Sequence, residues 1–187
     1  MPGLMTTFPK HYADTVARLR VPSGFLLVLV FAWFSHPTPG SLVTGLPISI
    51  AGLALRAWVA GDLVKNQRLV TGGPYAFTRN PLYIGTLMVA AGLTISARST
   101  GLGILFLGVF LLVYLPVIQL EQQHLQRLFP EFDAYAAEVP VLWPRLTPYQ
   151  GRSAGGFQPV LYMRNQEYQA AAGYAAGMLF LLWKALA

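Results

Sequence analysis

The sequence of 187 residues contains no cysteine and only three histidines. Without cysteine the chain cannot form disulfides, thiolate metal sites, iron–sulfur clusters or a cysteine nucleophile. His11, His36 and His124 are scattered and match no metal-binding spacing such as H-E-x-x-H. The sequence therefore predicts no metal site and no thiol chemistry.

Charged residues are also scarce, at 11% of the chain against 55% hydrophobic residues, and the mean hydropathy is +0.50. An ordinary soluble domain carries roughly 25% charged residues, so this chain lacks the means to cover a water-facing surface. The apolar residues come in long charge-free blocks, of which residues 21–55 are the longest. We therefore predict an all-α integral membrane protein.

The charge-free blocks divide into segments of the length that crosses a bilayer, about 20 residues. Prolines and a glycine between residues 35 and 41 break the first block, and Arg98 marks a tight hairpin between two later ones. The spans expected are about 19–36, 42–61, 81–97, 101–120 and 168–187. Residues 1–187 then form a single membrane domain, a bundle of about five helices with larger loops at 62–80 and 121–167. A cleaved signal peptide at 21–36 is the alternative, but an A-x-A-like cleavage site is missing.

Basic residues set the expected orientation, because they concentrate on the cytoplasmic side of membrane proteins. Ten of the thirteen fall on one side of the predicted bundle, and Arg98 and Lys184 fall on the other. The ten are Lys10, Arg18, Arg20, Lys65, Arg68, Arg79, Arg127, Arg145, Arg152 and Arg164. We expect a cytoplasmic N-terminus, both large loops in the cytoplasm, and a location in the inner membrane of a bacterium. The net charge of +6 is explained by the orientation of the helices and by contact with lipid headgroups. The sequence lacks a basic run with interleaved aromatic residues, so it predicts no nucleic-acid partner.

Two features inside the spans leave alternatives open. Gly173 and Gly177 have the small-xxx-small spacing of closely packed helices, which indicates packing within the chain or, alternatively, a homodimer. Oligomeric state therefore stays undecided. Arg56 either extends toward the cytoplasmic interface or faces the bundle and pairs with an acid such as Asp62 or Glu121.

The stretch 69–85 carries the densest set of candidate functional residues. Asn80 and Pro81 are typical of the N-cap and first position of a helix, so the free N–H groups that follow could hold a carboxylate or phosphate. Arg79 adds a positive charge, and the rings of Tyr75 and Tyr83 could face a cation. A ligand with both an anionic group and a cationic centre would suit this corner. The alternative is a well-capped helix start with interfacial tyrosines.

The second candidate stretch begins where the fourth span ends. Glu121 is the first charge after residues 99–120, and an ionisable group at the membrane edge is a functional candidate. His124 lies three residues on and shares its helix face. The alternative is a solvated helix end that only marks the boundary of the membrane.

Together the two stretches resemble the isoprenylcysteine carboxyl methyltransferase family and its phospholipid methyltransferase relatives. The first family motif, G-P-Y-x-x-x-R-[HN]-P-x-Y-x-G, is filled by residues 73–85. The second begins with E-E-x-x-L and continues through aromatic residues to Val-Pro, and Glu121, Leu125 and residues 139–140 match it. The likeness covers about residues 69–145. This chain departs from the pattern by having Asn80 for the usual histidine, Gln122 for the second glutamate and Pro130 for a glycine.

The resemblance implies an enzyme that binds S-adenosylmethionine at the cytoplasmic face and methylates a lipophilic or amphiphilic acceptor from the bilayer. It implies that Arg79 and the helix start at Asn80, Pro81 and Leu82 hold the cofactor carboxylate. Glu121 would bind the ammonium or the ribose hydroxyls, and Tyr75 and Tyr83 the sulfonium or adenine, with His124 nearby.

Methyl transfer is an in-line displacement, in which the protein mainly aligns the reacting atoms and excludes water. A carboxylate acceptor needs no general base, whereas an amine or thiol must lose a proton. Glu121, His124 or Glu167 could accept that proton, and Arg164 could orient an anionic acceptor.

Two other function classes remain open. Membrane sterol reductases share a similar architecture and a related motif but use NADPH, and they are longer than this chain. A non-catalytic membrane scaffold is the third reading, because Gln122 weakens the acidic pair. The methyl acceptor, and whether oxygen, nitrogen or sulfur is methylated, is not determined by the sequence.

Overall fold

The computed structural model describes residues 8–151 and 156–187, and the side chains of residues 19–23 are not described. Within those ranges every regular element is a helix, which confirms the all-α prediction. The α-helices are α1 (Lys10–Phe34), α2 (Pro39–Asp62), α3 (Pro81–Ala97), α4 (Thr100–Val109), α5 (Leu115–Leu128), α6 (Phe132–Glu138), α7 (Pro159–Arg164) and α8 (Tyr168–Leu186). A 3₁₀ turn, η1 (Gly73–Ala76), precedes α3, and a π-helical segment, η2 (Phe110–Tyr114), joins α4 to α5.

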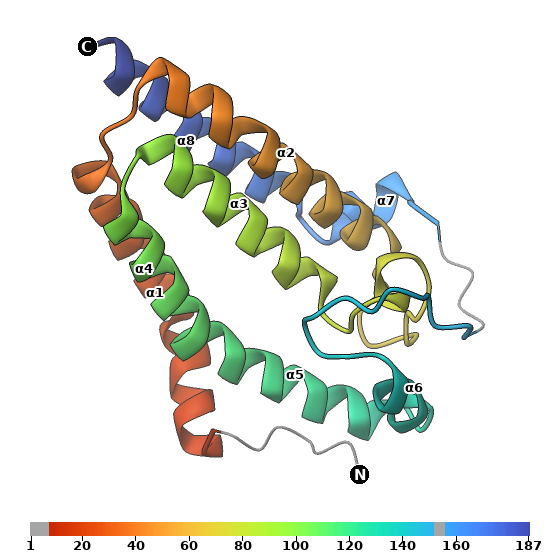
Figure 1. Cartoon of the computed structure of the whole chain (residues 1–187). Helices are drawn as coiled ribbons and strands as arrows, with labels where there is room; N and C mark the ends of the chain where they lie inside the picture. The colour runs from red at the N-terminus through yellow and green to blue at the C-terminus, as the bar shows by residue number, and fades with distance from the viewer. Residues whose placement is uncertain (1–7, 152–155) are drawn as a thin grey trace.

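The helices form a bundle in which α2, α3 and α8 run side by side, while α4 and α5 make one long helix that diverges from α3 (Figure 1). Local sequence explains where these helices begin and end. Thr38 and Ser41 form a reciprocal capping box around Pro39 at the start of α2. Arg98 adopts the left-handed conformation, with φ of 50°, and ends α3. The Ser99 hydroxyl then accepts from Leu102 N–H and starts α4, so the expected hairpin is present.

Helices α2 and α3 make the closest helix contact, and glycines make it possible. A Cβ on Gly52 would lie 2.7 Å from the carbonyl oxygen of Gly85, and a Cβ on Gly85 would lie 2.8 Å from that of Gly52. Gly45 and Gly92, each seven residues further along its helix, leave even less space, because a Cβ on Gly45 would collide with Ser96 and one on Gly92 with Ser49. Small residues let helix backbones approach in this way, so the pair is a rigid base for the elements at its end.

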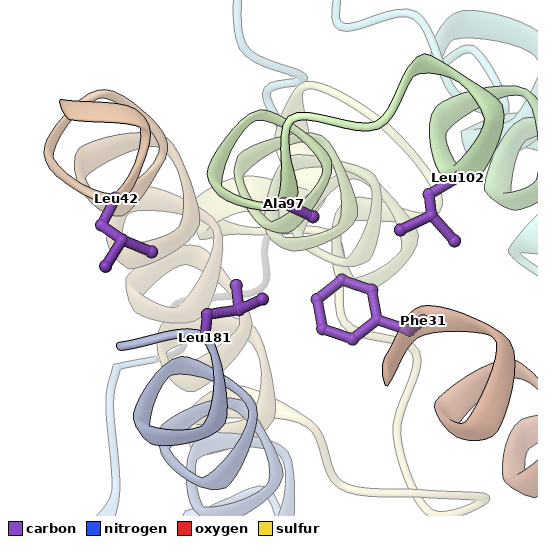
Figure 2. Packing of buried hydrophobic residues seen from close by; sticks show 5 residues of the cluster. All are labelled: Phe31, Leu42, Ala97, Leu102 and Leu181. Atoms are coloured by element: carbon purple, nitrogen blue, oxygen red, sulfur yellow. The ribbon is translucent and has the colours of Figure 1, made fainter. Parts of the chain in front are cut away.

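The far end of the bundle is held by an apolar cluster to which five helices contribute. Phe31 and Leu181 point toward each other among Leu42, Ala97 and Leu102 (Figure 2). Beside it, the Lys184 ammonium donates to the carbonyl oxygen of Ala32 at 2.8 Å and so satisfies the end of α1. Helix α8 is thereby fixed against α1, α2 and α3.

Apolar side chains also cover much of the outside of the bundle, among them Phe25, Trp33, Ile104 and Leu179. Helix α2 and the continuous helix Thr100–Leu128 are long and apolar enough to cross a membrane, and Gly24–Phe34 and Pro81–Ala97 are shorter apolar helices. Soluble monomers rarely expose apolar surface on this scale. The chain is therefore described as a helical membrane bundle, while five spans and a cytoplasmic N-terminus stay predictions.

Several details differ from what the sequence suggested. Helix α1 begins at Lys10 rather than near residue 19. Helix α8 falls outside the group of strongly apolar helices, because Tyr168, Gln169 and Lys184 lower its hydropathy. The expected packing at Gly173 and Gly177 within the chain is wrong: among the described residues, a Cβ on either would meet no atom within 4 Å. The alternative, a homodimer through this face, stays a prediction.

Candidate functional site

A cavity of about 220 Å³ lies at the end of the bundle where α2 ends, α3 begins and α5 ends. Its walls come from the segment after α2, the start of α3, the last turns of α5, and α6. Seven of the residues expected to bind the cofactor line it: Tyr75, Arg79, Asn80, Leu82, Tyr83, Glu121 and His124. The structure thus brings the two sequence stretches together around one space.

The stretch before α3 is held in place by the segment that follows α6. Arg79 N–H donates to the carbonyl oxygen of Pro140 at 2.9 Å, and the Asn80 side-chain amide donates to that of Val141 at 2.9 Å. The Tyr135 hydroxyl donates to the carbonyl oxygen of Tyr75 at 2.7 Å. These bonds fix the backbone on which the cavity residues stand.

Asn80 occupies the N-cap position of α3, as expected, but its side chain makes no capping hydrogen bond because the amide is directed to Val141. The N–H groups of Tyr83 and Ile84 instead donate to the carbonyl oxygen of Asn80, at 3.1 and 3.4 Å. The expected row of free N–H groups after Pro81 is therefore shortened, because those of Tyr83 and Ile84 are used. Pro81 itself is fully buried and does not line the cavity.

Arg79 is a partly buried cation whose polar partner is an amide. Its Nη1 donates to Gln122 Oε1 at 2.7 Å, and its guanidinium lies 6.0 Å from the centre of the Phe132 ring. Burial lowers the pKa of Arg79 from its usual high value. Arg79 Nε and Gln122 Nε2 are buried and have no hydrogen-bond partner among the described residues. No ion pair of Arg79 is found in the described ranges, so the cavity is lined by a cation without a carboxylate partner, with two unbonded donors buried beside it.

Glu121 lies on the same cavity and is linked to α3. The Tyr83 hydroxyl donates to Glu121 Oε2 at 3.1 Å. The Tyr83 ring packs edge-on against Tyr114, with 5.9 Å between the ring centres, and Phe110 stacks on Tyr114. Phe110 and Tyr114 belong to the π-helical segment η2, so this irregular turn places the ring that supports Tyr83.

The remaining cavity residues include a histidine and two tyrosines. A ring nitrogen of His124 lies 3.0 Å from Asn66 Oδ1. Burial raises the pKa of Tyr75 and of Tyr135, so both hydroxyls stay neutral at physiological pH.

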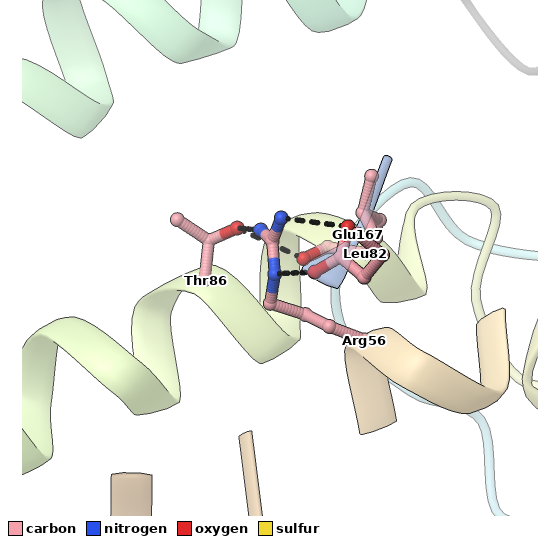
Figure 3. Close-up of polar contacts among 4 residues, drawn as sticks. All are labelled: Arg56, Leu82, Thr86 and Glu167. Carbon is pink, nitrogen blue, oxygen red and sulfur yellow. Dashed lines mark hydrogen bonds and ion pairs between the residues drawn. The ribbon is translucent and has the colours of Figure 1, made fainter. Parts of the chain in front are cut away.

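Glu167 and Arg56 form a separate polar cluster behind the start of α3 (Figure 3). Arg56 Nε and Nη2 bind the two carboxylate oxygens of Glu167 at 2.5 and 3.0 Å, and Nη1 donates to the Thr86 hydroxyl. Thr86 in turn donates to the carbonyl oxygen of Leu82 at 3.0 Å. Of the two alternatives for Arg56, pairing with an acid is therefore confirmed, but the acid is Glu167 rather than Asp62 or Glu121, because the turn between α7 and α8 lies against this part of α2. Asp62 pairs instead with Arg68, at 3.4 Å.

Arg164 is exposed at the end of α7, and neither Arg164 nor Glu167 lines the cavity. The neighbouring Asn165 amide donates to the carbonyl oxygens of Ala60 and Leu63, at 2.9 and 2.8 Å, and so fastens this turn to the end of α2. The structure thus separates these two residues from the other candidates.

Sequence reasoning did not select Gln122, Tyr114 or Tyr135 as site residues. Gln122 had a signal, because it stands where the family motif has an acid. Tyr114 had none, since nothing in the sequence marks the π-helical segment.

Comparison with known proteins adds a family and a few relatives. A family model described as phospholipid methyltransferase matches residues 46–131. The chain is 38% identical over 122 residues to the cobalt-zinc-cadmium resistance protein CzcN of Cupriavidus metallidurans, covering 64% of this chain and 56% of that protein. It is 38% identical over 99 residues to the nickel-cobalt-cadmium resistance protein NccN of Alcaligenes xylosoxydans xylosoxydans, covering 50% and 46%.

A more distant relative carries an enzyme's name. The protein-S-isoprenylcysteine O-methyltransferase of Schizosaccharomyces pombe is 28% identical over 137 residues, covering 70% of this chain and 58% of that protein. The chain thus spans about half the length of the curated relatives it matches. No solved structure shows a significant match.

Within the described ranges, no group of three or more His, Asp or Glu side chains is placed to hold a metal ion.

Proposed function

Because a phospholipid methyltransferase family model matches residues 46–131 and a distant relative is named as an isoprenylcysteine O-methyltransferase, we propose that this chain transfers a methyl group from S-adenosylmethionine to a lipophilic or amphiphilic acceptor. The cavity between the ends of α2, α3 and α5 would hold the cofactor. The reaction would take place at the cytoplasmic face of a bacterial inner membrane, with the acceptor reaching it from the bilayer.

The observation that supports this proposal most directly is the unpaired charge of Arg79. A partly buried cation with an unbonded Nε, next to the unbonded amide Nε2 of Gln122, favours an anionic partner. The methionine part of the cofactor supplies a carboxylate. Charge-assisted hydrogen bonds from Arg79 and Gln122 would satisfy both sides at once.

The rest of the cavity suits the positive part of the same molecule. Glu121 offers a carboxylate to the ammonium group or to the ribose hydroxyls. The buried ring of Tyr83 and the neutral ring of Tyr75 offer aromatic faces to the sulfonium centre. Glu121 and the tyrosine rings beside Arg79 are therefore complementary to a zwitterion that carries an additional positive centre. Lys65 and Arg68 also line the cavity.

When bound, the cofactor supplies an activated methyl group to a nucleophile aligned with the sulfur–carbon bond. The residues of this chain would hold the two molecules in line and keep water out. An amine or thiol acceptor needs a proton acceptor, and Glu121 and His124 are the candidates on the cavity. Glu167 is bound to Arg56, so it supports the start of α3 rather than facing the cavity.

The names of two relatives refer to metal resistance and state no activity. Those names do not indicate which molecule a methyltransferase of this kind would methylate. We therefore leave the acceptor as an amphiphile of the membrane.

The test is calorimetric titration of the detergent-solubilised protein with S-adenosylhomocysteine, 5′-methylthioadenosine and NADPH. Loss of a charge-assisted hydrogen bond costs about 1.5–3 kcal/mol, which is about 10- to 150-fold in affinity. Arg79→Met should weaken S-adenosylhomocysteine by about this factor and leave 5′-methylthioadenosine, which lacks the carboxylate, nearly unchanged.

Arg164→Met is the matched control, because it removes an exposed arginine away from the cavity, and it should bind like the natural protein. If NADPH bound and the other two ligands did not, the proposed function would change from methyl transfer to reduction. If none of the three ligands bound, a non-catalytic role would take its place.

A further inference from the structure

The segment between α6 and α7 carries two apolar side chains that are almost completely exposed. Trp143 is 87% exposed and Leu146 is 99% exposed, more than any other large apolar residue in the described ranges. They lie in a stretch without regular secondary structure. In an irregular segment of a water-soluble surface, side chains of this size would normally turn inward or be replaced by polar ones.

Their exposure is built into the fold, because the backbone on both sides is hydrogen-bonded. The carbonyl oxygen of Pro140 accepts from Arg79 N–H at 2.9 Å, and Arg145 N–H donates to that of Phe77 at 2.9 Å. Further along, Tyr149 N–H donates to the carbonyl oxygen of Ala76 at 2.9 Å. The segment is thus laid along the stretch that precedes α3, with Trp143 and Leu146 directed away from the protein.

The residues just before Trp143 contact the membrane helices. Val141 and Leu142 pack against a buried cluster of Tyr83, Phe110 and Ile118. Tyr83 belongs to the apolar helix α3, and the other two belong to the long apolar helix Thr100–Leu128. In Figure 1 this segment passes between the start of α3 and the second half of α5. The residues next to Trp143 therefore contact two of the apolar helices directly.

We propose that Trp143 and Leu146 insert into the headgroup region of the lipid bilayer on the side of the cavity. Tryptophan favours this depth because its ring is apolar and its N–H remains hydrated. Arg145, which lies between them in the sequence, is paired with Glu138 at 3.6 Å, so it brings no unpaired charge to this surface. The lipid contact requires the membrane location of the helices and is independent of methyl transfer.

The test uses a protein in which Trp143 is the sole tryptophan, made with Trp33→Phe, Trp58→Phe and Trp183→Phe. It is reconstituted into phosphatidylcholine vesicles, some with bromine atoms high on the acyl chains. We expect Trp143 emission to be blue-shifted, to lose intensity in brominated vesicles, and to be little quenched by aqueous iodide.

The matched control carries Glu131→Trp in the same background with Trp143→Phe, since Glu131 is exposed and lies at the start of α6 beyond the membrane helices. Its emission should be quenched by iodide and unaffected by bromine. Iodide quenching of Trp143 equal to that of the control, without quenching by brominated lipid, would overturn the proposal.

A second measurement covers the case in which the triple variant does not fold. Trp143→Phe alone should then remove part of the bromine-quenchable emission of the natural protein. An unchanged quenchable fraction would again overturn the insertion.

Discussion

The ion pair between Arg56 and Glu167 makes a quantitative prediction about stability. Glu167→Gln keeps the shape of the side chain and removes its charge. The Arg56 side chain is 17% exposed and that of Glu167 is 9% exposed, so the substitution leaves a largely buried guanidinium with the Thr86 hydroxyl and a neutral amide. Breaking one side of a buried pair typically costs about 3–5 kcal/mol. Because Arg56 retains some access to solvent, we expect a loss at or below the lower end of this range, about 2–3 kcal/mol.

Removing both charges should have a different result. In Arg56→Met/Glu167→Leu no charge is left uncompensated, and such replacements are commonly neutral or stabilising by about 1–4 kcal/mol. We therefore expect the double variant to be at least as stable as the natural protein. The difference between single and double variants isolates the cost of the unpaired charge from the value of the pair.

The measurement is unfolding of the detergent-solubilised protein by a rising fraction of sodium dodecyl sulfate, followed by circular dichroism. The control is Glu138→Gln, which breaks the pair with Arg145, where the Glu138 side chain is 60% exposed. Such a surface pair should contribute less than about 1 kcal/mol. If Glu167→Gln destabilised the protein no more than Glu138→Gln, the reasoning from burial would be refuted.

The double variant also decides what Glu167 does in the reaction. The sequence suggested that Glu167 accepts a proton from the acceptor, whereas the structure binds it to Arg56, away from the cavity. If the folded double variant retains methyl transfer, Glu167 is a positioning residue. Activity lost without loss of S-adenosylhomocysteine binding would restore its proposed catalytic role.

Three further outcomes follow from the structure. Gln122→Glu should place a carboxylate beside Arg79 and weaken S-adenosylhomocysteine binding by about tenfold or more in calorimetry, and unchanged affinity would exclude an anion at this point. Gly92→Leu should destabilise the protein by several kcal/mol in the same unfolding assay, because a Cβ there would collide with Ser49, whereas Gly108→Leu, with open space in the described structure, should have little effect. Burial raises the pKa of Tyr75 and of Tyr135, so as the pH rises these hydroxyls lose their protons in the unfolded chain before they do so in the folded protein. Deprotonation therefore favours unfolding. Stability should therefore be independent of both groups below about pH 10 and fall above it, as followed by tyrosinate absorbance and circular dichroism.

The sequence predicted those parts of the molecule that depend on local composition and on the paired motifs. Charge-free blocks indicated the helices, and the hairpin at Arg98 followed from a single polar interruption. The sequence also indicated that Tyr83 and Glu121 line one cavity, because the two motifs that contain them occur together in the family that the chain resembles.

Other contacts had no local signal. Arg56 and Glu167 are 111 residues apart in the sequence. Their side chains meet only because the turn between α7 and α8 packs against the end of α2. Asn80 has the residue type of a helix cap, yet a carbonyl group 61 residues later competes for its amide. The glycines of α2 and α3 matter through their mutual register, which neither helix specifies alone.

The short stretch before α3 connects the bilayer side of the molecule to the cavity. The side chain of Arg79 brings a positive charge to the cavity, while its N–H donates to the carbonyl oxygen of Pro140, three residues before Trp143. Asn80 likewise lines the cavity and holds Val141. These two hydrogen bonds give a ligand that orders Arg79 and Asn80 a route to the backbone that carries Trp143. Coupling by this route would be reciprocal, so lipid contact at Trp143 would then act on the cavity. S-Adenosylhomocysteine should accordingly bind more tightly to the protein in vesicles than in detergent, and Trp143→Ala should reduce that difference. Equal affinity in both environments would show that the two ends of this stretch respond independently.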